Sequence, residues 1–321
     1  MTLGAAIRGR LRCPVCRGAL SAKPELLACL TPACGATFPV VNGVPVLIGG
    51  ERSVFADARR GAAGPVSFDE STEPGWKRRL RPFMPKLERN LCANRMLVEL
   101  ARRLDERPGQ ASVLVVGGGV LGDSMETLVA DDRIELIEGD VFFGPRVDVL
   151  FDAHDIPFAD ETFDAVIAQA VLEHVLDPQR CVEEFARVLK PSGLAYAETP
   201  FMQQVHGGAY DFTRFSLLGH RRLFRRFEEI DSGMALGPGA ALAWSWTYFL
   251  ASFCQTPRSR SAAHLAGSLT AFFWKWFDLY LARRPAALDA ASGVYFLGVK
   301  GPPGWVLADH DLIASYRGIH G

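Results

Sequence analysis

Residues 111–140 read ASVLVVGGGVLGDSMETLVADDRIELIEGD, and this stretch decides the fold. An apolar run at 113–116 is bounded at once by glycines, as expected for a central parallel strand. Glycines allow the chain to turn sharply and approach a ligand closely, here Gly117, Gly119 and Gly122. A second strand ends at Asp140, whose carboxylate can accept both hydroxyls of a ribose. The pattern predicts a nucleoside-containing cofactor at the carboxyl ends of two parallel strands.

The glycine spacing alone leaves two other interpretations open. Together with Asp140, it also satisfies the dinucleotide-binding fingerprint. Similar glycine turns also occur in α/β proteins that bind no ligand at that place. The residues after Asp140 therefore have to distinguish these classes of protein.

Composition limits the range of functions. The chain has 321 residues, enough for one large domain and a small one, and 49% of them are hydrophobic. A net charge of -1 gives no global attraction to nucleic acid. We find neither a signal peptide at the N-terminus nor an apolar run of the roughly 18 residues that span a bilayer. Four of the seven cysteines are clustered as metal ligands, so we expect a cytoplasmic protein.

The clustered cysteines are Cys13, Cys16, Cys29 and Cys34, in the spacing C-x2-C-x12-C-x4-C. Two close pairs separated by a hairpin can present four thiolates to one Zn²⁺ ion. The alternative, two disulfides, would need an oxidising compartment. The segment from CPVCRGAL to FPVVNGVPVLI, within residues 11–48, resembles the Trm112-like zinc-ribbon family, whose members accompany methyltransferases. We expect a structural zinc, because all four ligands are thiolates and none is left open for a substrate.

The domain boundaries follow from composition. We expect the zinc ribbon over residues 1–50, a linker rich in Ala, Gly, Asp and Glu over 51–75, and the main domain over 76–321. A helical pattern occupies 76–106, with a break near Pro82 and Pro85. Its basic cluster at 77–81 either touches phosphates or is a solvated helix face.

Strands and helices alternate after Asp140. We predict strands over 147–151, 163–169 and 194–198, with a helix that stops at the sequence KPSG, residues 190–193. Two further strands are predicted at 227–236 and 294–300. This rhythm is typical of a doubly wound α/β fold, a mostly parallel sheet with helices on both faces.

The segments DAHDIPFADETFDAVIAQAVLEHV (152–175) and EEFARVLKPSG (183–193) carry a specific resemblance. They look like class I S-adenosylmethionine-dependent methyltransferases, over roughly residues 111–235. The resemblance implies a seven-stranded, Rossmann-like sheet and S-adenosylmethionine as cofactor. Carried over by position, the cofactor-binding residues would be Gly117, Gly119, Asp140, Asp152, Ala153, Gln169 and Ala170. Asp152 and Ala153 would contact the adenine, and Gln169 and Ala170 the methionine part.

The chain departs from the family pattern at Val115. An acidic residue usually stands two places before the first glycine and helps to anchor the cofactor's ammonium group. The third glycine is also displaced, to Gly122. A non-catalytic binding module on this fold is therefore an alternative from another class.

Polar side chains gather in the loop after the predicted strand 194–198, where an acceptor would meet the methyl group. We predict His206 as the catalytic base, with Asp211 orienting it or acting as base itself. The alternative is that His206 only binds loop backbone. Glu173 and His174 are expected to be structural, as cap, loop or neighbouring residues, without a catalytic role. A basic face at 221–226 would meet an anionic acceptor or simply be solvated.

An apolar insertion at 238–291 contains two predicted helices, 240–254 and 265–282, rich in Trp, Phe and Tyr. They would form a lid, a homodimer surface or a peripheral membrane contact, or just pack on the domain. The function we expect is O-methylation of a sugar, a glycolipid or another small metabolite. The acceptor would be a small molecule, a glycan or a lipid-linked compound. An RNA methyltransferase is the alternative within the class, although nucleic acid fits this insertion less well.

Overall fold

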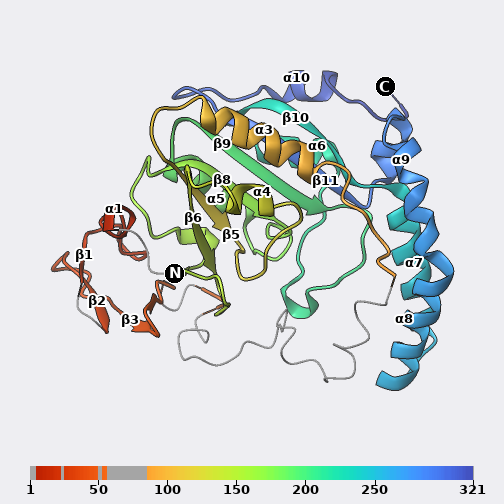
Figure 1. Cartoon of the computed structure of the whole chain (residues 1–321), viewed down its shortest axis with the longest axis horizontal. Helices are drawn as coiled ribbons and strands as arrows, with labels where there is room; N and C mark the ends of the chain where they lie inside the picture. Colours follow the sequence, from red (N-terminus) through yellow and green to blue (C-terminus); the bar gives the residue numbers. More distant parts are fainter. Residues whose placement is uncertain (1–4, 23–24, 50–52, 56–84, 321) are drawn as a thin grey trace.

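The computed structural model describes residues 5–22, 25–49, 53–55 and 85–320 (Figure 1). The predicted linker, apart from 53–55, and the basic cluster at 77–81 lie outside the described residues. Within the described part of the chain, no helix is both long and apolar enough to cross a membrane.

A seven-stranded sheet has the order β10-β11-β9-β8-β5-β6-β7. Its strands are β5 (Ala111–Val116), β6 (Ile134–Asp140), β7 (Val149–Leu150), β8 (Phe163–Gln169), β9 (Leu189–Pro200), β10 (Phe227–Leu236) and β11 (Gly293–Lys300). The strands from β9 to β7 run parallel, and β11 is antiparallel to both β9 and β10. This confirms the predicted mostly parallel sheet.

Helices cover both faces of this sheet because its central strands are apolar on both sides. On one face, α5 (Pro178–Val188) packs its apolar stripe against Leu114, Val116 and their neighbours. On the other face, α3 (Ala93–Asp105) packs on Val113 and Val115. The shorter elements are α4 (Glu126–Val129), η4 (Ala153–Asp155), η5 (Gly208–Tyr210), α6 (Leu217–Leu223) and α10 (Asp309–Ala314).

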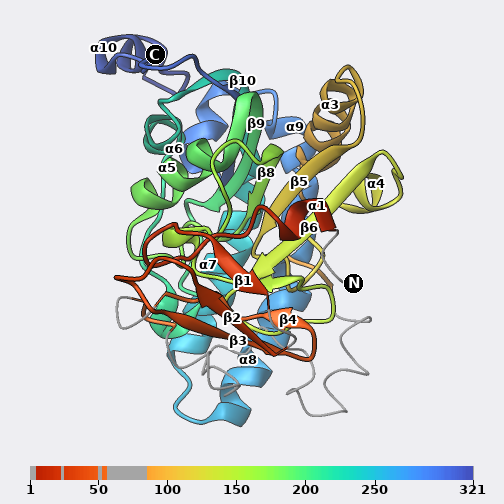
Figure 2. The same ribbon diagram turned by 90° about the vertical axis from the view of Figure 1, so that its left-hand side faces the viewer.

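The N-terminal residues form a small antiparallel sheet in the order β1-β2-β3-β4, which fits a zinc ribbon. After the short helix α1 (Ala5–Arg8) come β1 (Leu20–Ala22), β2 (Leu26–Cys29), β3 (Thr37–Val41) and β4 (Val44–Pro45). The chain after β4 pairs with the edge strand β7, where the Leu47 amide donates to the Leu150 carbonyl at 2.7 Å. Phe38 and Leu47 lie in the same core as the main domain. In Figure 2 the small sheet of β1 to β4, in red to orange, lies in front of the main domain.

Two predicted boundaries are wrong at their ends. The strand predicted at 194–198 begins earlier, at Leu189. The residues KPSG after Leu189 belong to this strand, and the pairing with β8 shifts register between Phe163 and Ala165. The predicted start of the helical pattern at residue 76 lies outside the described residues; after the predicted break near Pro82 and Pro85, the helix begins only at Ala93. The side chain of Asn90 accepts hydrogen bonds from the Cys92 and Ala93 amides, which starts the helix there.

The insertion forms a helical hairpin at one side of the molecule (Figure 1). Its first helix, α7 (Pro238–Ser252), agrees with the prediction, but the single helix predicted at 265–282 is wrong. Residues 257–290 instead form four successive elements: α8 (Pro257–Ala271), η6 (Phe272–Trp276), α9 (Asp278–Leu281) and η7 (Pro285–Ala290). The buried Asp278 carboxylate accepts from the Gly239 and Ala240 amides, so it turns inward to cap α7.

Candidate active site

Each glycine of the turn after β5 packs against another part of the site. Gly117 has a φ of +79°, and a Cβ atom there would lie 2.5 Å from Val171 Cγ2. A Cβ on Gly119 would lie 2.8 Å from Asp140 Oδ2, and one on Gly122 only 2.1 Å from Gln169 Oε1. The turn is therefore closed down onto the ends of β6 and β8, with no room for side chains.

Asp140 ends β6 and faces the glycine turn, as the sequence predicts. Its Oδ2 accepts from the Gly119 amide at 3.0 Å, and its Oδ1 from the Val141 and Phe142 amides at 2.6 and 3.1 Å. Burial raises the pKa of this carboxyl, against the effect of these backbone amides. These three amides occupy three of the roughly four lone-pair sites of the carboxylate, and the remaining site on Oδ2 can accept a ribose hydroxyl.

Asp152 lies just after β7, and three hydrogen bonds hold it in place. It accepts from Ser53 Oγ at 2.5 Å, from the His154 amide at 3.0 Å, and meets His154 Nδ1 at 2.5 Å. Burial acts to raise the pKa of Asp152, but the hydrogen bonds from His154 and Ser53 outweigh it, so the pKa is lowered. Ala153 follows as a buried residue of η4.

An aromatic cluster lies next to Asp152, which sequence reasoning missed. Phe55, two residues after Ser53, stacks on Tyr210 with ring centroids 5.2 Å apart. It also meets Phe142 edge-on at 6.1 Å. Phe142 follows Asp140 in the chain, so these rings stand beside both acids. Only the contact between residues 53–55 and the domain reveals this cluster, because nothing in the local sequence pattern marks it.

A polar group lies at the carboxyl ends of β8 and β9. Gln169 Nε2 donates to Glu198 Oε1 at 2.8 Å, and Asn90 Nδ2 donates to Glu198 Oε2 at 2.7 Å. Burial raises the pKa of Glu198. Ala170, next to Gln169, has a φ of +54°, a conformation that non-glycine residues rarely adopt. Sequence reasoning found Gln169 and Ala170 but missed Glu198 and Asn90.

The loop after β9 brings Asp211 against His206. Asp211 accepts from the His206 and Gly207 amides at 2.8 and 3.0 Å and pairs with Arg214. Although burial opposes it, Arg214 together with the amides holds the pKa of Asp211 well below its usual range. This arrangement favours Asp211 as a residue that orients the loop, rather than as a base.

His206 also faces two residues to which the sequence assigned no catalytic role. Its Nε2 lies 3.8 Å from Glu173 Oε1, and the His174 Nε2 lies 3.7 Å from the same oxygen. Glu173 is fully buried, and both of its carboxylate oxygens lack a hydrogen-bond partner among the described residues. Burial raises the pKa of Glu173 to about 8. The only local sequence signal for this contact is a Glu-His pair in the turn that follows the central strand β8.

The basic face at 221–226 is engaged in ion pairs within the chain. Arg221 is buried and its Nε lies 2.6 Å from Glu229 Oε2, while Arg222 and Arg225 both approach Asp309. These contacts favour a structural role for the three arginines over contact with an anionic acceptor.

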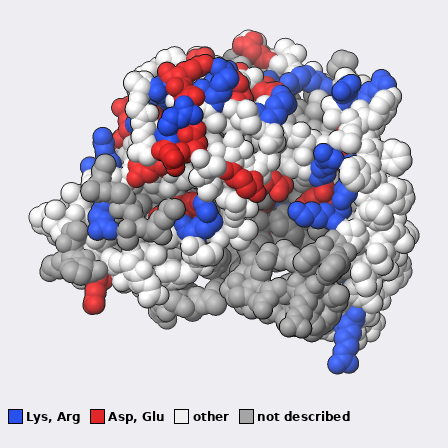
Figure 3. Space-filling view, in the orientation of Figure 1, with Lys and Arg blue, Asp and Glu red and all other residues white. Residues whose placement is uncertain are grey.

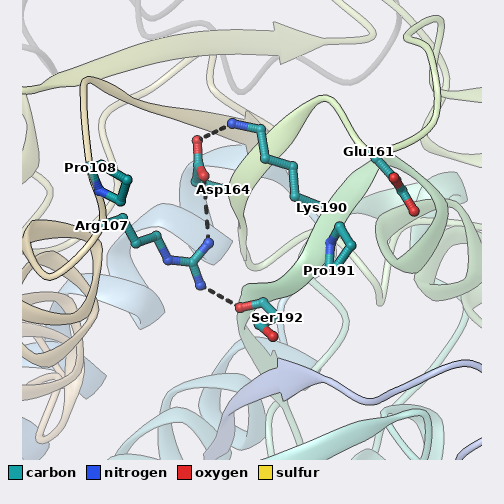
Figure 4. A pocket seen from close by; sticks show the side chains of 7 residues that line it. All are labelled: Arg107, Pro108, Glu161, Asp164, Lys190, Pro191 and Ser192. Atoms are coloured by element: carbon teal, nitrogen blue, oxygen red, sulfur yellow. Dashed lines mark hydrogen bonds and ion pairs between the residues drawn. The ribbon is translucent and has the colours of Figure 1, made fainter.

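A shallow depression lies at the opposite end of the sheet, near the amino ends of β8 and β9 (Figure 4). Three of its charged side chains pair with one another: Asp164 lies 2.7 Å from Lys190 Nζ and 3.5 Å from Arg107 Nη1. Ligands of such sheets bind at the carboxyl ends of the strands. We therefore place the candidate active site at Asp140, and not in this depression.

The comparisons with known proteins point to the same part of the chain. A family model described as a methyltransferase domain matches residues 132–197. The demethylmenaquinone methyltransferase of Clavibacter sepedonicus is 36% identical over 75 residues, which are 23% of this chain and 26% of that protein. The ubiquinone/menaquinone biosynthesis C-methyltransferase UbiE of Saccharophagus degradans is 35% identical over 104 residues, 32% of this chain and 41% of that protein. The matches thus span less than half the length of these relatives.

Among solved structures, the phosphoethanolamine N-methyltransferase 2 of Haemonchus contortus in complex with S-adenosyl-L-methionine aligns with a TM-score of 0.41. The identity is 15%, over 65% of this chain and 53% of that one. The sheet order and the family match carry the assignment. The large sheet has the class I methyltransferase fold, and residues 132–197 within it match a methyltransferase domain.

Proposed function

We propose that the protein transfers a methyl group from S-adenosylmethionine to a small acceptor. The observation that carries this proposal is the glycine turn closed onto Asp140 and Gln169 at the carboxyl ends of β5, β6 and β8. In this proposal Asp140 holds the ribose, and Asp152 with Ala153 contacts the adenine. The cofactor supplies an electrophilic methyl group on a sulfonium sulfur, and the protein aligns the acceptor with it.

Glu198 offers a carboxylate for the cofactor's ammonium group, which Val115 cannot hold. In the sheet, Val115 of β5 pairs with Ile167 of β8, which in turn pairs with Tyr196 of β9. Two residues further along these strands, Gln169 pairs with Glu198. Because side chains alternate along a strand, Glu198 lies on the same face as Val115, toward the carboxyl ends. In our proposal Glu198 and Gln169 therefore replace the missing acid, which argues for a working cofactor site over a non-catalytic module.

We infer an apolar or lipid-linked acceptor from the surface of the helical hairpin. Large side chains of α7, α8, η6 and α9 are exposed to solvent: Leu242, Trp246, Phe249, Phe253, Leu265, Leu269, Phe272, Phe273, Trp276, Phe277, Leu279 and Tyr280. The surface over α7 and α8, at the right of Figure 3, shows few charged residues. Such aromatic surfaces suit a membrane interface, so we propose peripheral contact of residues 240–282 with a bilayer.

Our preferred chemistry is O-methylation of a sugar, a glycolipid or another small metabolite. C-methylation of a quinone precursor is a second candidate, favoured by the two quinone-related methyltransferases that the chain matches in part. Both acceptor classes fit the apolar surface of the helical hairpin better than RNA does.

The test is release of S-adenosylhomocysteine in the presence of glycolipid extract, a demethylated quinone or total RNA, with product masses determined. We expect turnover with a lipid-soluble acceptor that is lost in Asp140→Ala. Turnover with RNA alone would reject the proposed lipid-soluble acceptor. The absence of turnover with every acceptor would contradict the proposed methyltransferase activity.

We also propose that the four ribbon cysteines hold a structural zinc ion. The Cys13 and Cys34 sulfurs lie 3.8 Å apart, and those of Cys16 and Cys29 3.4 Å apart. A tetrahedral zinc ion with Zn–S bonds of about 2.3 Å requires sulfur–sulfur distances of roughly 3.8 Å. Disulfide bonds would require about 2 Å. The donor set therefore fits the ion and leaves no open position.

A further inference from the structure

We propose that Glu173, His174 and His206 form a second metal site, for one divalent transition ion such as Zn²⁺, separate from the cysteine cluster. One carboxylate oxygen and two imidazole nitrogens of these residues lie within 4.8 Å of one another. The residues come from two segments, the turn after β8 and the loop after β9. Their convergence is therefore a product of the tertiary fold and not of local sequence.

The distances suit a bound ion after small movements. Glu173 Oε1 lies 3.7 Å from His174 Nε2 and 3.8 Å from His206 Nε2. Zinc bonds of about 2.0–2.1 Å in tetrahedral geometry place two donor atoms roughly 3.4 Å apart. Each side chain would have to move by less than about 1 Å to close on the ion.

The far side of each imidazole ring faces a backbone carbonyl. His174 Nδ1 lies 2.6 Å from the Tyr210 carbonyl oxygen, and His206 Nδ1 lies 3.3 Å from that of Gln204. A carbonyl can only accept, so each Nδ1 carries the proton and each Nε2 presents its lone pair toward Glu173. Metal-binding histidines are oriented in this way by their second nitrogen.

Glu173 lacks the partners that other buried carboxylates have. Glu138 pairs with Arg146, and Glu184 with Arg187, whereas both oxygens of the fully buried Glu173 have no hydrogen-bond partner among the described residues. The nearby Arg214 is already paired with Asp211. A buried, unpaired carboxylate is costly, and a bound cation would remove that cost.

Among the described residues, the surroundings leave access for an ion and one more ligand. The His206 side chain is 26% exposed, and Gly207 has no Cβ, which would otherwise lie 2.5 Å from the His174 ring. Two histidines and one carboxylate are a donor set that leaves coordination positions open. This set differs from the closed cysteine cluster, which holds four thiolates.

The role of the ion rests on the proposed function. An acceptor hydroxyl would occupy an open position, and the ion would lower its pKa so that its proton is released to water. The resulting oxygen forms the O–CH₃ bond as the S–CH₃ bond breaks. The sulfonium then leaves as neutral S-adenosylhomocysteine, which balances charge and atoms.

The test counts metal in the full chain without any cofactor. We would titrate chelator-treated protein with Zn²⁺ and with Co²⁺, and follow binding by calorimetry and the cobalt spectrum. We expect two equivalents for the wild type, one with intense thiolate-to-cobalt absorption and one without it. Glu173→Gln and His206→Ala should each lose only the second equivalent, with at least about tenfold weaker binding.

His310→Ala is the matched control, because the exposed His310 lies in α10, outside the three residues of the cluster, and this variant should keep both equivalents. Thermal unfolding checks that the variants are folded. A single, thiolate-bound equivalent in the wild type would overturn the proposal, as would two equivalents in folded Glu173→Gln. Binding of S-adenosylhomocysteine is measured separately, so its failure would reject the proposed function while leaving the metal site standing.

Discussion

The Gly119 amide donates a hydrogen bond of 3.0 Å to Asp140 Oδ2 and so ties the turn after β5 to the end of β6. The two neighbouring parallel strands thus present a glycine backbone and a carboxylate at one point. This relationship is specific, because a Cβ on Gly119 would lie 2.8 Å from that same oxygen. The site therefore depends on a residue without a side chain.

Gly119→Ala should weaken the binding of S-adenosylhomocysteine by at least about tenfold, or about 1.4 kcal/mol, because the new methyl group displaces Asp140. Calorimetry on folded protein measures the effect. Gly49→Ala is the control, because a Cβ there meets Pro14 only at 3.7 Å, an ordinary contact. Equal affinities in the two variants would contradict this account of the turn.

Glu198→Gln should weaken S-adenosylhomocysteine severalfold but leave 5′-methylthioadenosine unaffected, since the latter lacks the ammonium group. Glutamine keeps the shape and removes the charge. Titration of both nucleosides separates a contact with the amino acid part from a general loss of the site. If both ligands weaken equally, Glu198 only holds the strand ends together.

The sequence predicted those parts of the molecule whose signals are local. Apolar runs ended by glycine or acid predicted the central strands, and the role of Asp140 was predicted from its place at the end of β6. The helix predicted at 265–282 was wrong because Asp278 turns inward to cap α7, a tertiary contact that periodicity cannot show. Phe55 was missed for the same reason, since it matters through the distant residue Tyr210 that it meets. The approach of Glu173 to His206 is likewise a tertiary contact that the local sequence does not show.

Removal of zinc should destabilise the whole chain and not only its N-terminus. Leu11, Cys13 and Phe38 belong to the same core as β5 and β8, so the ribbon supports the main domain. Elemental analysis and thermal unfolding of Cys16→Ser would measure this, and we expect one zinc ion fewer and a lower Tm. A metal-free ribbon with an unchanged Tm would show that zinc is not structural.

His220 should make the protein sensitive to acid. It is fully buried among Phe215 and Phe224, its ring nitrogens lack hydrogen-bond partners among the described residues, and burial lowers its pKa to about 3. Between about pH 6.5 and pH 3 the unfolded chain binds a proton there and the native state does not, so stability falls as the pH falls.

His220→Leu should remove this effect because leucine has no group to protonate. Between pH 7.5 and 5.5 the wild type should lose about 1 kcal/mol more unfolding free energy than the variant. Urea unfolding at both pH values measures it. His310→Leu is the control, because His310 is exposed to solvent, and this variant should behave as the wild type. Equal losses of unfolding free energy in all three proteins would rule out this role for His220.

The central claim is a cofactor site at Asp140, and calorimetric titration of the zinc-loaded protein with S-adenosylhomocysteine tests it most directly. We expect one binding site of micromolar affinity in the wild type, weakened at least about 100-fold, or about 2.7 kcal/mol, in Asp140→Ala. No binding to the folded wild type, or equal affinity in the variant, would contradict the claim.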